Sequence, residues 1–72
     1  MSTALNYLRD ALAINPNDAE THYFMGDIYS SQGQFKDARA SYRTSLQFDL
    51  PEVMAQQARR RIAEINEKIG VE

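Results

Sequence analysis

Residues 15–51 read N-P-N-D-A-E-T-H-Y-F-M-G-D-I-Y-S-S-Q-G-Q-F-K-D-A-R-A-S-Y-R-T-S-L-Q-F-D-L-P, and this stretch decides the fold. A proline stands at each end, in Asn15-Pro16 and at Pro51, where it interrupts helical structure. Between the two prolines apolar residues recur at spacings of three and four, as on one face of an α-helix. Gly33 divides the stretch and supplies the left-handed residue that ends many helices. The stretch therefore predicts two helices joined by a tight turn.

The residues before this stretch repeat its second half at an offset of 34. A period of this length is typical of a helix–turn–helix unit in a solenoid. At the second proline the offset is one residue larger than 34, because Leu50 is inserted before Pro51. The corresponding pairs are Ala4 and Ala38, Leu8 and Tyr42, Ala11 and Ser45, Leu12 and Leu46, Ile14 and Phe48, Asn15 and Asp49, and Pro16 and Pro51.

The whole chain of 72 residues reads as one all-α domain with about four helices. We expect helices over residues 4–14, 18–31, 34–48 and 51–69. The links between them are two to four residues long, so sequential helices should pack antiparallel. Asn17 with Glu20 has the spacing of a capping box at the second helix, and Asp18 is a competing cap. The expected inner face of that helix comprises Phe24, Met25, Ile28 and Tyr29.

Composition excludes several classes of function. The net charge is −2 with acids and bases interspersed, which gives no electrostatic case for nucleic acid or an anionic membrane. No cysteine is present, so disulfides and thiolate metal sites are excluded. No apolar run approaches the roughly 20 residues that span a bilayer, and no signal peptide is visible. A cytoplasmic location is the default expectation.

Residues 19–50 resemble a tetratricopeptide repeat (TPR). The resemblance of this segment lies in small and aromatic residues at fixed spacings on two helices. Together with the two flanking segments, the resemblance covers nearly the whole chain. In this sequence those residues are His22, Met25, Gly26, Tyr29, Gly33, Phe35, Ala38, Tyr42 and Ser45.

The resemblance implies a TPR-like fragment of an α-solenoid. Residues 3–16 correspond to the second helix of a partial repeat, and residues 18–50 form one complete repeat. Residues 51–69 resemble the helix that closes such arrays, although Arg59 and Arg60 replace the usual Leu-Gly pair. Independently of the family, Gly26 and Ala38 fall where two antiparallel helices would cross, and small residues there allow close approach.

The resemblance also implies a concave groove lined by the first helix of each repeat. Glu20, Tyr23, Asp27 and Ser30 share the face of that helix that packing does not use. One reading makes this face a partner-binding stripe with Tyr23 as an exposed aromatic anchor. The other reading is an ordinary solvated helix face. The two acids would repel an acidic terminus, so we expect a neutral or basic partner segment and no carboxylate clamp.

No catalytic constellation is present, and the sequence predicts neither an enzyme, a cofactor nor a metal site. His22 lacks the partner and cleft that a general base needs, and we expect it to pack. The basic residues Lys36, Arg39 and Arg43, like the run of arginines at 59–61, are expected to be solvated.

Two functions remain in competition. The first is a protein–protein interaction module, a piece of a longer helical-repeat protein whose preceding helix would cover Leu5, Leu8 and Leu12. The second is a self-associating structural unit, in which another copy would cover the same three leucines. Repeat scaffolds serve many functions, so the sequence does not name the partner.

Overall fold

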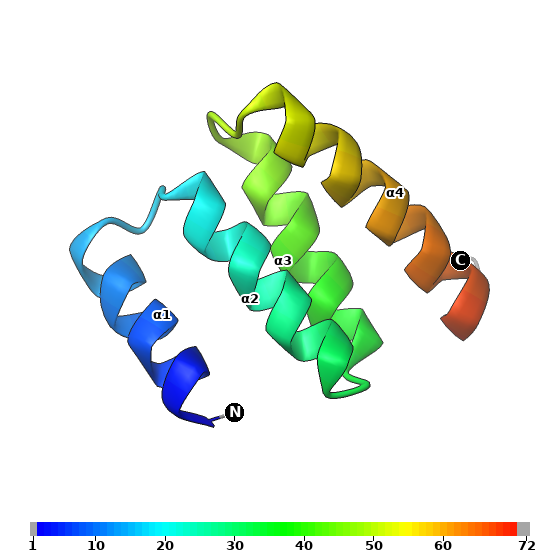
Figure 1. Ribbon diagram of the computed structural model, residues 1–72, viewed down its shortest axis with the longest axis horizontal. Helices are drawn as coiled ribbons and strands as arrows, with labels where there is room; N and C mark the ends of the chain where they lie inside the picture. The colour runs from blue at the N-terminus through cyan, green and yellow to red at the C-terminus, as the bar shows by residue number, and fades with distance from the viewer. Residues whose placement is uncertain (1, 71–72) are drawn as a thin grey trace.

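The computed structural model describes residues 2–70 and confirms an all-α fold. The element order is α1 (Ser2–Ile14), α2 (Ala19–Ser31), α3 (Phe35–Gln47) and α4 (Glu52–Ile69) (Figure 1). Helices that are neighbours in sequence pack antiparallel, with α1 on α2, α2 on α3 and α3 on α4. Each predicted helix is present, and no helix end differs from the prediction by more than two residues.

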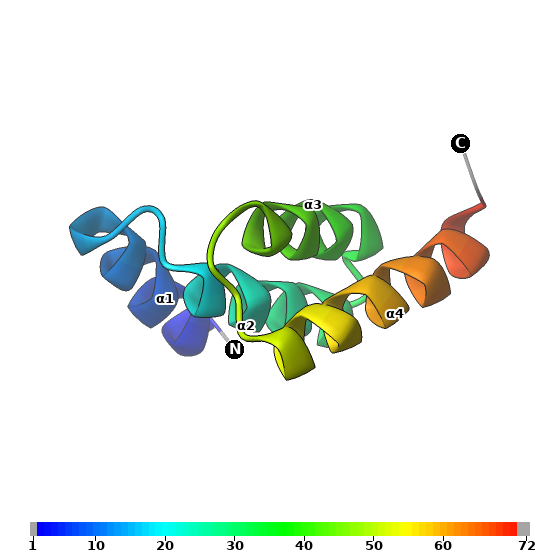
Figure 2. The ribbon, with the colours of Figure 1, turned by 90° about the horizontal axis from the view of Figure 1, so that it is seen from above.

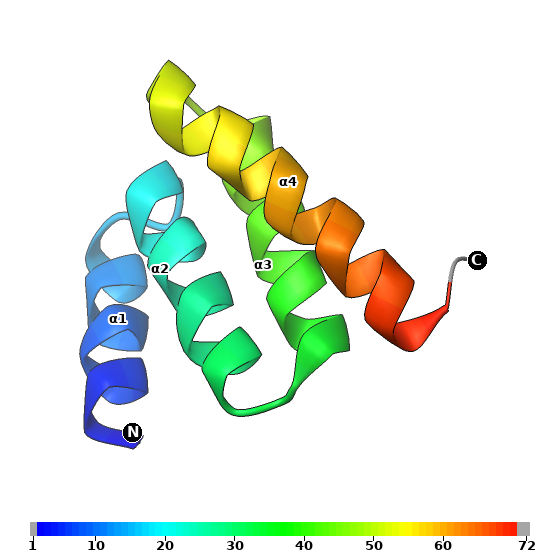
Figure 3. The ribbon, with the colours of Figure 1, turned by 45° about the vertical axis from the view of Figure 1, so that its right-hand side comes forward.

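The four helices form an array rather than a closed bundle. Figure 2 shows α3 on one side of the array, with α2 and the beginning of α4 on the other. Figure 3 shows α1 running beside α2 and α4 crossing along α3. Helix α3 therefore packs between two neighbours, α2 and α4. Among the described residues, α1 has substantial contact with α2 alone.

Both ends of α2 are defined by local hydrogen bonds. The Asp18 side chain accepts a bond from the backbone N–H of Thr21 at 3.4 Å, so Asp18 is the N-cap in preference to the capping box predicted at Asn17. At the other end Gly33 has a φ of 80°, as predicted. The N–H of Gln34 then bonds back to the carbonyl of Tyr29 at 2.9 Å, which satisfies a free carbonyl of the last turn.

The closest approach of α2 and α3 lies at Gly26 and Tyr42. Tyr42 is fully buried, and a Cβ on Gly26 would lie 2.7–2.9 Å from atoms of the Tyr42 ring. Glycine thus leaves the space that the ring occupies. Ala38 and Ser45 on α3 are also fully buried. The prediction of a small residue at this crossing is confirmed, with the Tyr42 ring as its direct neighbour.

The inner face of α2 differs from the prediction at two adjacent residues. Tyr23, expected to be exposed, is 4% exposed, and its ring lies edge-on to Tyr42 with centroids 5.6 Å apart. Phe24, expected to be inside, is 46% exposed. The physical reason is that α2 has helices on both sides, so its buried face is wider than one stripe and is rotated toward Tyr23.

Candidate protein-binding face

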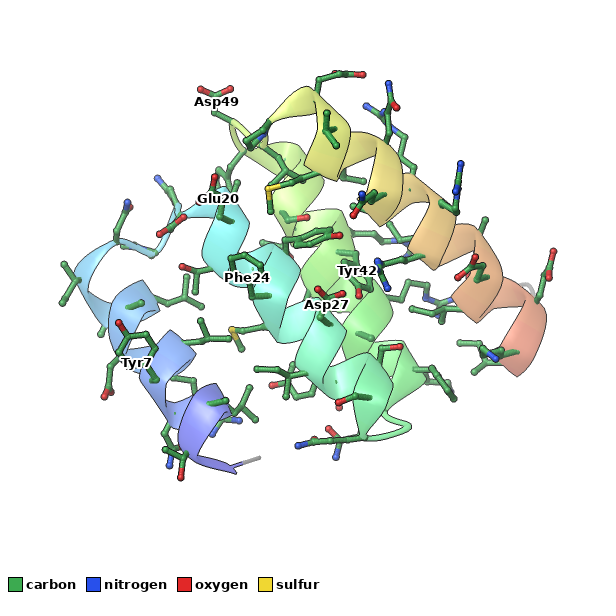
Figure 4. The ribbon with its side chains drawn as sticks, in the orientation of Figure 1. Tyr7, Glu20, Phe24, Asp27, Tyr42 and Asp49 are labelled. Atoms are coloured by element: carbon green, nitrogen blue, oxygen red, sulfur yellow. The ribbon has the colours of Figure 1, made fainter. Side chains whose placement is uncertain are left out.

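The candidate site is the surface of α2 and α4 that faces away from α3, which we call the front face. It comprises Glu20, Phe24 and Asp27 of α2 and Gln57 and Arg61 of α4. Figure 4 shows Glu20, Phe24 and Asp27 following one another along the near side of α2. Their spacing of three and four residues places them on one side of the helix.

Two side-chain contacts join α2 to α4 across this face. The Tyr23 hydroxyl donates a hydrogen bond to Oε1 of Gln57 at 2.8 Å. The Arg61 guanidinium lies 3.6 Å from Oδ1 of Asp27. In each contact the partners are 34 residues apart, which is the offset found in the sequence between α1 and α3. Helix α4 therefore occupies the position in the array that α2 occupies one repeat earlier.

Asp27 is held by partners within the chain. The buried Tyr42 hydroxyl donates a short hydrogen bond to Oδ1 of Asp27, and Arg61 approaches the same oxygen. Burial raises the pKa of Tyr42, and the bond to Asp27 raises it further. The pKa of Arg61 is also raised, chiefly by the Tyr23 hydroxyl and in part by the charge of Asp27. This carboxylate thus ties α2, α3 and α4 together.

The predicted site residues therefore divide into different environments. Glu20 is exposed and Ser30 is half-buried. Tyr23 lies beneath the front face and supports Gln57, so the exposed aromatic side chain of this face is that of Phe24. The Phe24 ring packs edge-on against Tyr23, with centroids 5.8 Å apart.

Sequence reasoning missed Gln57 and Arg61 as members of this face. The signal that could have found them is the period itself, because adding 34 to Tyr23 and Asp27 gives these two residues. A depression of about 330 Å³ lies beside them on α4, lined by Gln57, Arg60, Arg61 and Glu64. Its charged and amide lining offers hydrogen bonds to a polar chain.

His22 serves packing, as predicted. Its ring stacks on Phe48 with centroids 6.0 Å apart, and its Nε2 lies 3.0 Å from the carbonyl oxygen of Pro16. These contacts fasten the beginning of α2 to the end of α3 and to the preceding link.

Several cations on α3 and α4 are engaged within the chain. Arg39 donates to Asn66 at 2.6 Å, and the Lys68 ammonium lies over the Phe35 ring at 5.7 Å. Arg61 pairs with Asp27, so these cationic side chains have partners within the chain. Within residues 2–70 no helix is long and apolar enough to cross a membrane. The same part of the chain has no cluster of three or more metal-ligating side chains.

The exposed apolar residues of α1 are different from those predicted. Leu5, Leu8 and Leu12, predicted as a possible self-association face, are half-buried. Tyr7 and Ile14 are 73% and 88% exposed. Figure 4 shows Tyr7 on the side of α1 that is turned away from α2.

Comparison with known protein families agrees with this architecture. The family model described as tetratricopeptide repeat matches residues 1–62. No solved structure matches the chain.

Proposed function

Since the chain belongs to the tetratricopeptide repeat family, whose members typically serve as protein–protein interaction modules, we propose that its front face binds a segment of a partner protein. The observation that carries the proposal is Phe24, an aromatic side chain 46% exposed on the front face. Its neighbours Asp27, Gln57 and Arg61 are held by hydrogen bonds or an ion pair. Aromatic side chains supply a large share of binding energy at protein interfaces.

The chemistry of the front face describes the segment that would fit. An apolar side chain of the partner would contact the Phe24 ring, and polar groups would reach Gln57 and the depression on α4. Glu20 is exposed beside Phe24 and favours a neutral or basic side chain at that point (Figure 4). Asp27 adds less to this preference, because Arg61 already pairs with it. Ser30 would extend the contact surface along α2.

A peptide library displayed on phage tests this proposal. We expect selected peptides to bind the wild-type chain and to lose at least tenfold in affinity with Phe24→Ala, which corresponds to about 1.4 kcal/mol. Tyr7→Ala is the matched control, because Tyr7 is an exposed aromatic residue on another side of the molecule. Circular dichroism would verify that both variants are folded.

The outcomes separate the front face from other surfaces. Peptides that bind equally well to wild type and Phe24→Ala would overturn the proposal. For a basic peptide selected from the library, Glu20→Lys should also weaken binding relative to the wild-type chain. Tighter binding of an acidic peptide than of a basic one to the wild-type chain would contradict the proposed charge preference.

Self-association is a second candidate, favoured by the exposure of Tyr7 and Ile14 on α1. Its test is the sedimentation coefficient measured over a range of concentrations. A chain that stays monomeric up to millimolar concentration would remove this candidate.

A further inference from the structure

The hydrogen bonds beneath the front face run in one direction. The Tyr23 hydroxyl has Arg61 and Gln57 as its polar neighbours. A guanidinium only donates hydrogen bonds, so the hydroxyl oxygen can only accept from Arg61. The hydroxyl proton is therefore left for Gln57, and it is donated to Oε1 of that side chain at 2.8 Å.

This direction sets the orientation of the Gln57 carboxamide. Its oxygen is turned to Tyr23, so its nitrogen Nε2, with two N–H groups, is turned away. A flipped amide would leave the Tyr23 proton without this acceptor. The Gln57 side chain is exposed, and none of the hydrogen bonds described within residues 2–70 uses its Nε2. Gln57 thus presents a hydrogen-bond donor on the front face.

One turn further along α2, Asp27 presents an acceptor. The Tyr42 hydroxyl and Arg61 both meet the same carboxylate oxygen, Oδ1. The second oxygen, Oδ2, has no hydrogen bond to another side chain among residues 2–70, and the Asp27 side chain is 36% exposed. The front face therefore offers one donor and, one helical turn along, one acceptor.

The spacing of these two groups fits an extended chain. Tyr23 and Asp27, like their partners Gln57 and Arg61, are four residues apart, which is about 6 Å along a helix. Main-chain groups on the same side of an extended strand repeat every two residues, or about 6.6 Å. A helical segment would offer few such groups, because its own turns use them.

We infer that Gln57 binds a main-chain carbonyl of a partner segment in extended conformation, and that Tyr23 is the positioning residue that keeps the Gln57 amide turned for this contact. Asp27 accepts a main-chain N–H from the same side of the segment. The inference rests on the proposed function of the front face and adds the conformation of the segment and the group that is recognised. Phe24 would select an apolar side chain, whereas Gln57 selects an extended main chain.

The test uses peptides that are selected from the phage library on the wild-type chain and are weakened by Phe24→Ala. Gln57→Glu replaces the donor by an acceptor and should lower their affinity about tenfold, because two oxygens would then face each other. Gln56→Glu is the matched control, since this neighbouring amide is also exposed and the change of charge is the same. In ¹⁵N spectra, peptide binding should shift the side-chain amide signals of Gln57 and leave those of Gln56 in place.

Tyr23→Phe tests the positioning role. Loss of the hydroxyl should lower the affinity of the same peptides about threefold, because the Gln57 amide is then free to turn. In a Gln57→Ala chain, Tyr23→Phe should have no further effect on affinity. A general loss of structure would instead weaken binding in both chains, and circular dichroism would verify that the variants are folded.

Peptides with single main-chain esters test the recognised group. An ester carbonyl is a weaker acceptor than an amide carbonyl, so one ester should lower the affinity for the wild-type chain severalfold. The same ester should leave the affinity for Gln57→Ala unchanged. If replacing one asparagine or glutamine of the peptide by alanine removes the shift of the Gln57 amide, the acceptor is a side chain and the inference is overturned.

The remaining outcomes separate this inference from the proposal on which it rests. If no selected peptide depends on Phe24, the front-face proposal fails and the inference fails with it. If Phe24→Ala weakens binding and Gln57→Glu does not, the inference alone is overturned. A bound peptide whose nuclear Overhauser contacts are those of a helix would overturn it as well.

Discussion

Helices α1 and α3 carry the same residue pattern 34 positions apart but lie in different surroundings. Helix α3 is packed between α2 and α4, and its residues Ala38, Tyr42 and Ser45 are fully buried. Helix α1 packs on α2, and its residue Ile14 is almost fully exposed. The pattern of a repeat thus specifies which side of a helix can be covered, and the neighbouring helices determine whether it is covered.

The less covered helix is also the more apolar one. Where α3 has Arg39, Ser41 and Ser45, α1 has Leu5, Tyr7 and Ala11. A helix side that faces water is usually polar. The outer side of α4 is an example, because it carries Gln56, Arg60 and Glu64. The two outer helices of the array therefore differ in polarity, with α1 apolar and α4 polar on the exposed side.

The largest expected difference between the two helices is at Tyr42 and its counterpart Leu8. Tyr42→Ala should lower the free energy of unfolding by about 3–5 kcal/mol, because it empties a fully buried site. Leu8→Ala should cost about 1–2 kcal/mol, since Leu8 is half-buried. Urea titration followed by circular dichroism measures both. Equal costs would show that α1 is as enclosed as α3.

A smaller difference is expected at the crossing glycine and its counterpart on α4. Gly26→Ala should cost about 1–3 kcal/mol despite the better helix propensity of alanine, because the new methyl group would press on the Tyr42 ring. Arg60→Ala should change stability by less than about 0.5 kcal/mol, as is usual for exposed positions. The same urea titrations compare the pair, and a neutral Gly26→Ala would contradict the close packing of α2 on α3.

The hydroxyl of Tyr42 should make stability depend on alkaline pH. Its pKa is raised in the folded chain above the ordinary value of 10.0, so the unfolded chain releases this proton first. The stabilisation is fully present below pH 10.0 and is lost as the pH rises above it. Thermal unfolding measured from pH 7 upward should show this decline.

Tyr42→Phe should reduce the loss of folding stability at alkaline pH. At neutral pH it should lower the free energy of unfolding by about 1 kcal/mol, because it removes the hydrogen bond to Asp27. Tyr7→Phe is the control, because Tyr7 is exposed and its substitution should leave the pH profile unchanged. A profile identical in Tyr42→Phe and wild type would exclude Tyr42 as the cause.

The smallest difference is expected at the helix ends. Phe48→Ala should cost about 1 kcal/mol, because it removes the stack on His22. Ile14→Ala should change stability by less than about 0.5 kcal/mol, since that side chain is exposed in the free chain. Differential scanning calorimetry on both variants measures the contrast. A large loss with Ile14→Ala would mean that the Ile14 side chain is buried in solution.

The sequence predicted the four helices, the Gly33 turn and the small residue at the crossing of α2 and α3, because these depend on periodicity and on local backbone requirements. It was wrong about Tyr23 and Phe24, which are adjacent and both aromatic. The choice between them depends on how α2 is rotated between its neighbours, and on the partner that Gln57 offers to the Tyr23 hydroxyl. At the beginning of α2 two caps competed, and hydrogen-bond geometry favours Asp18.

The extra residue between α3 and α4 has a consequence for how such chains tolerate insertions and deletions. The two prolines are 35 positions apart, yet Tyr23 meets Gln57 and Asp27 meets Arg61 at 34. The link absorbs Leu50 in a tight bend, where its N–H bonds to the Phe48 carbonyl at 2.9 Å. One residue inserted within α4 before Gln57 would instead turn both contact residues by about 100° around the helix axis. Length can therefore vary in the links, whereas the phase of each helix must be kept.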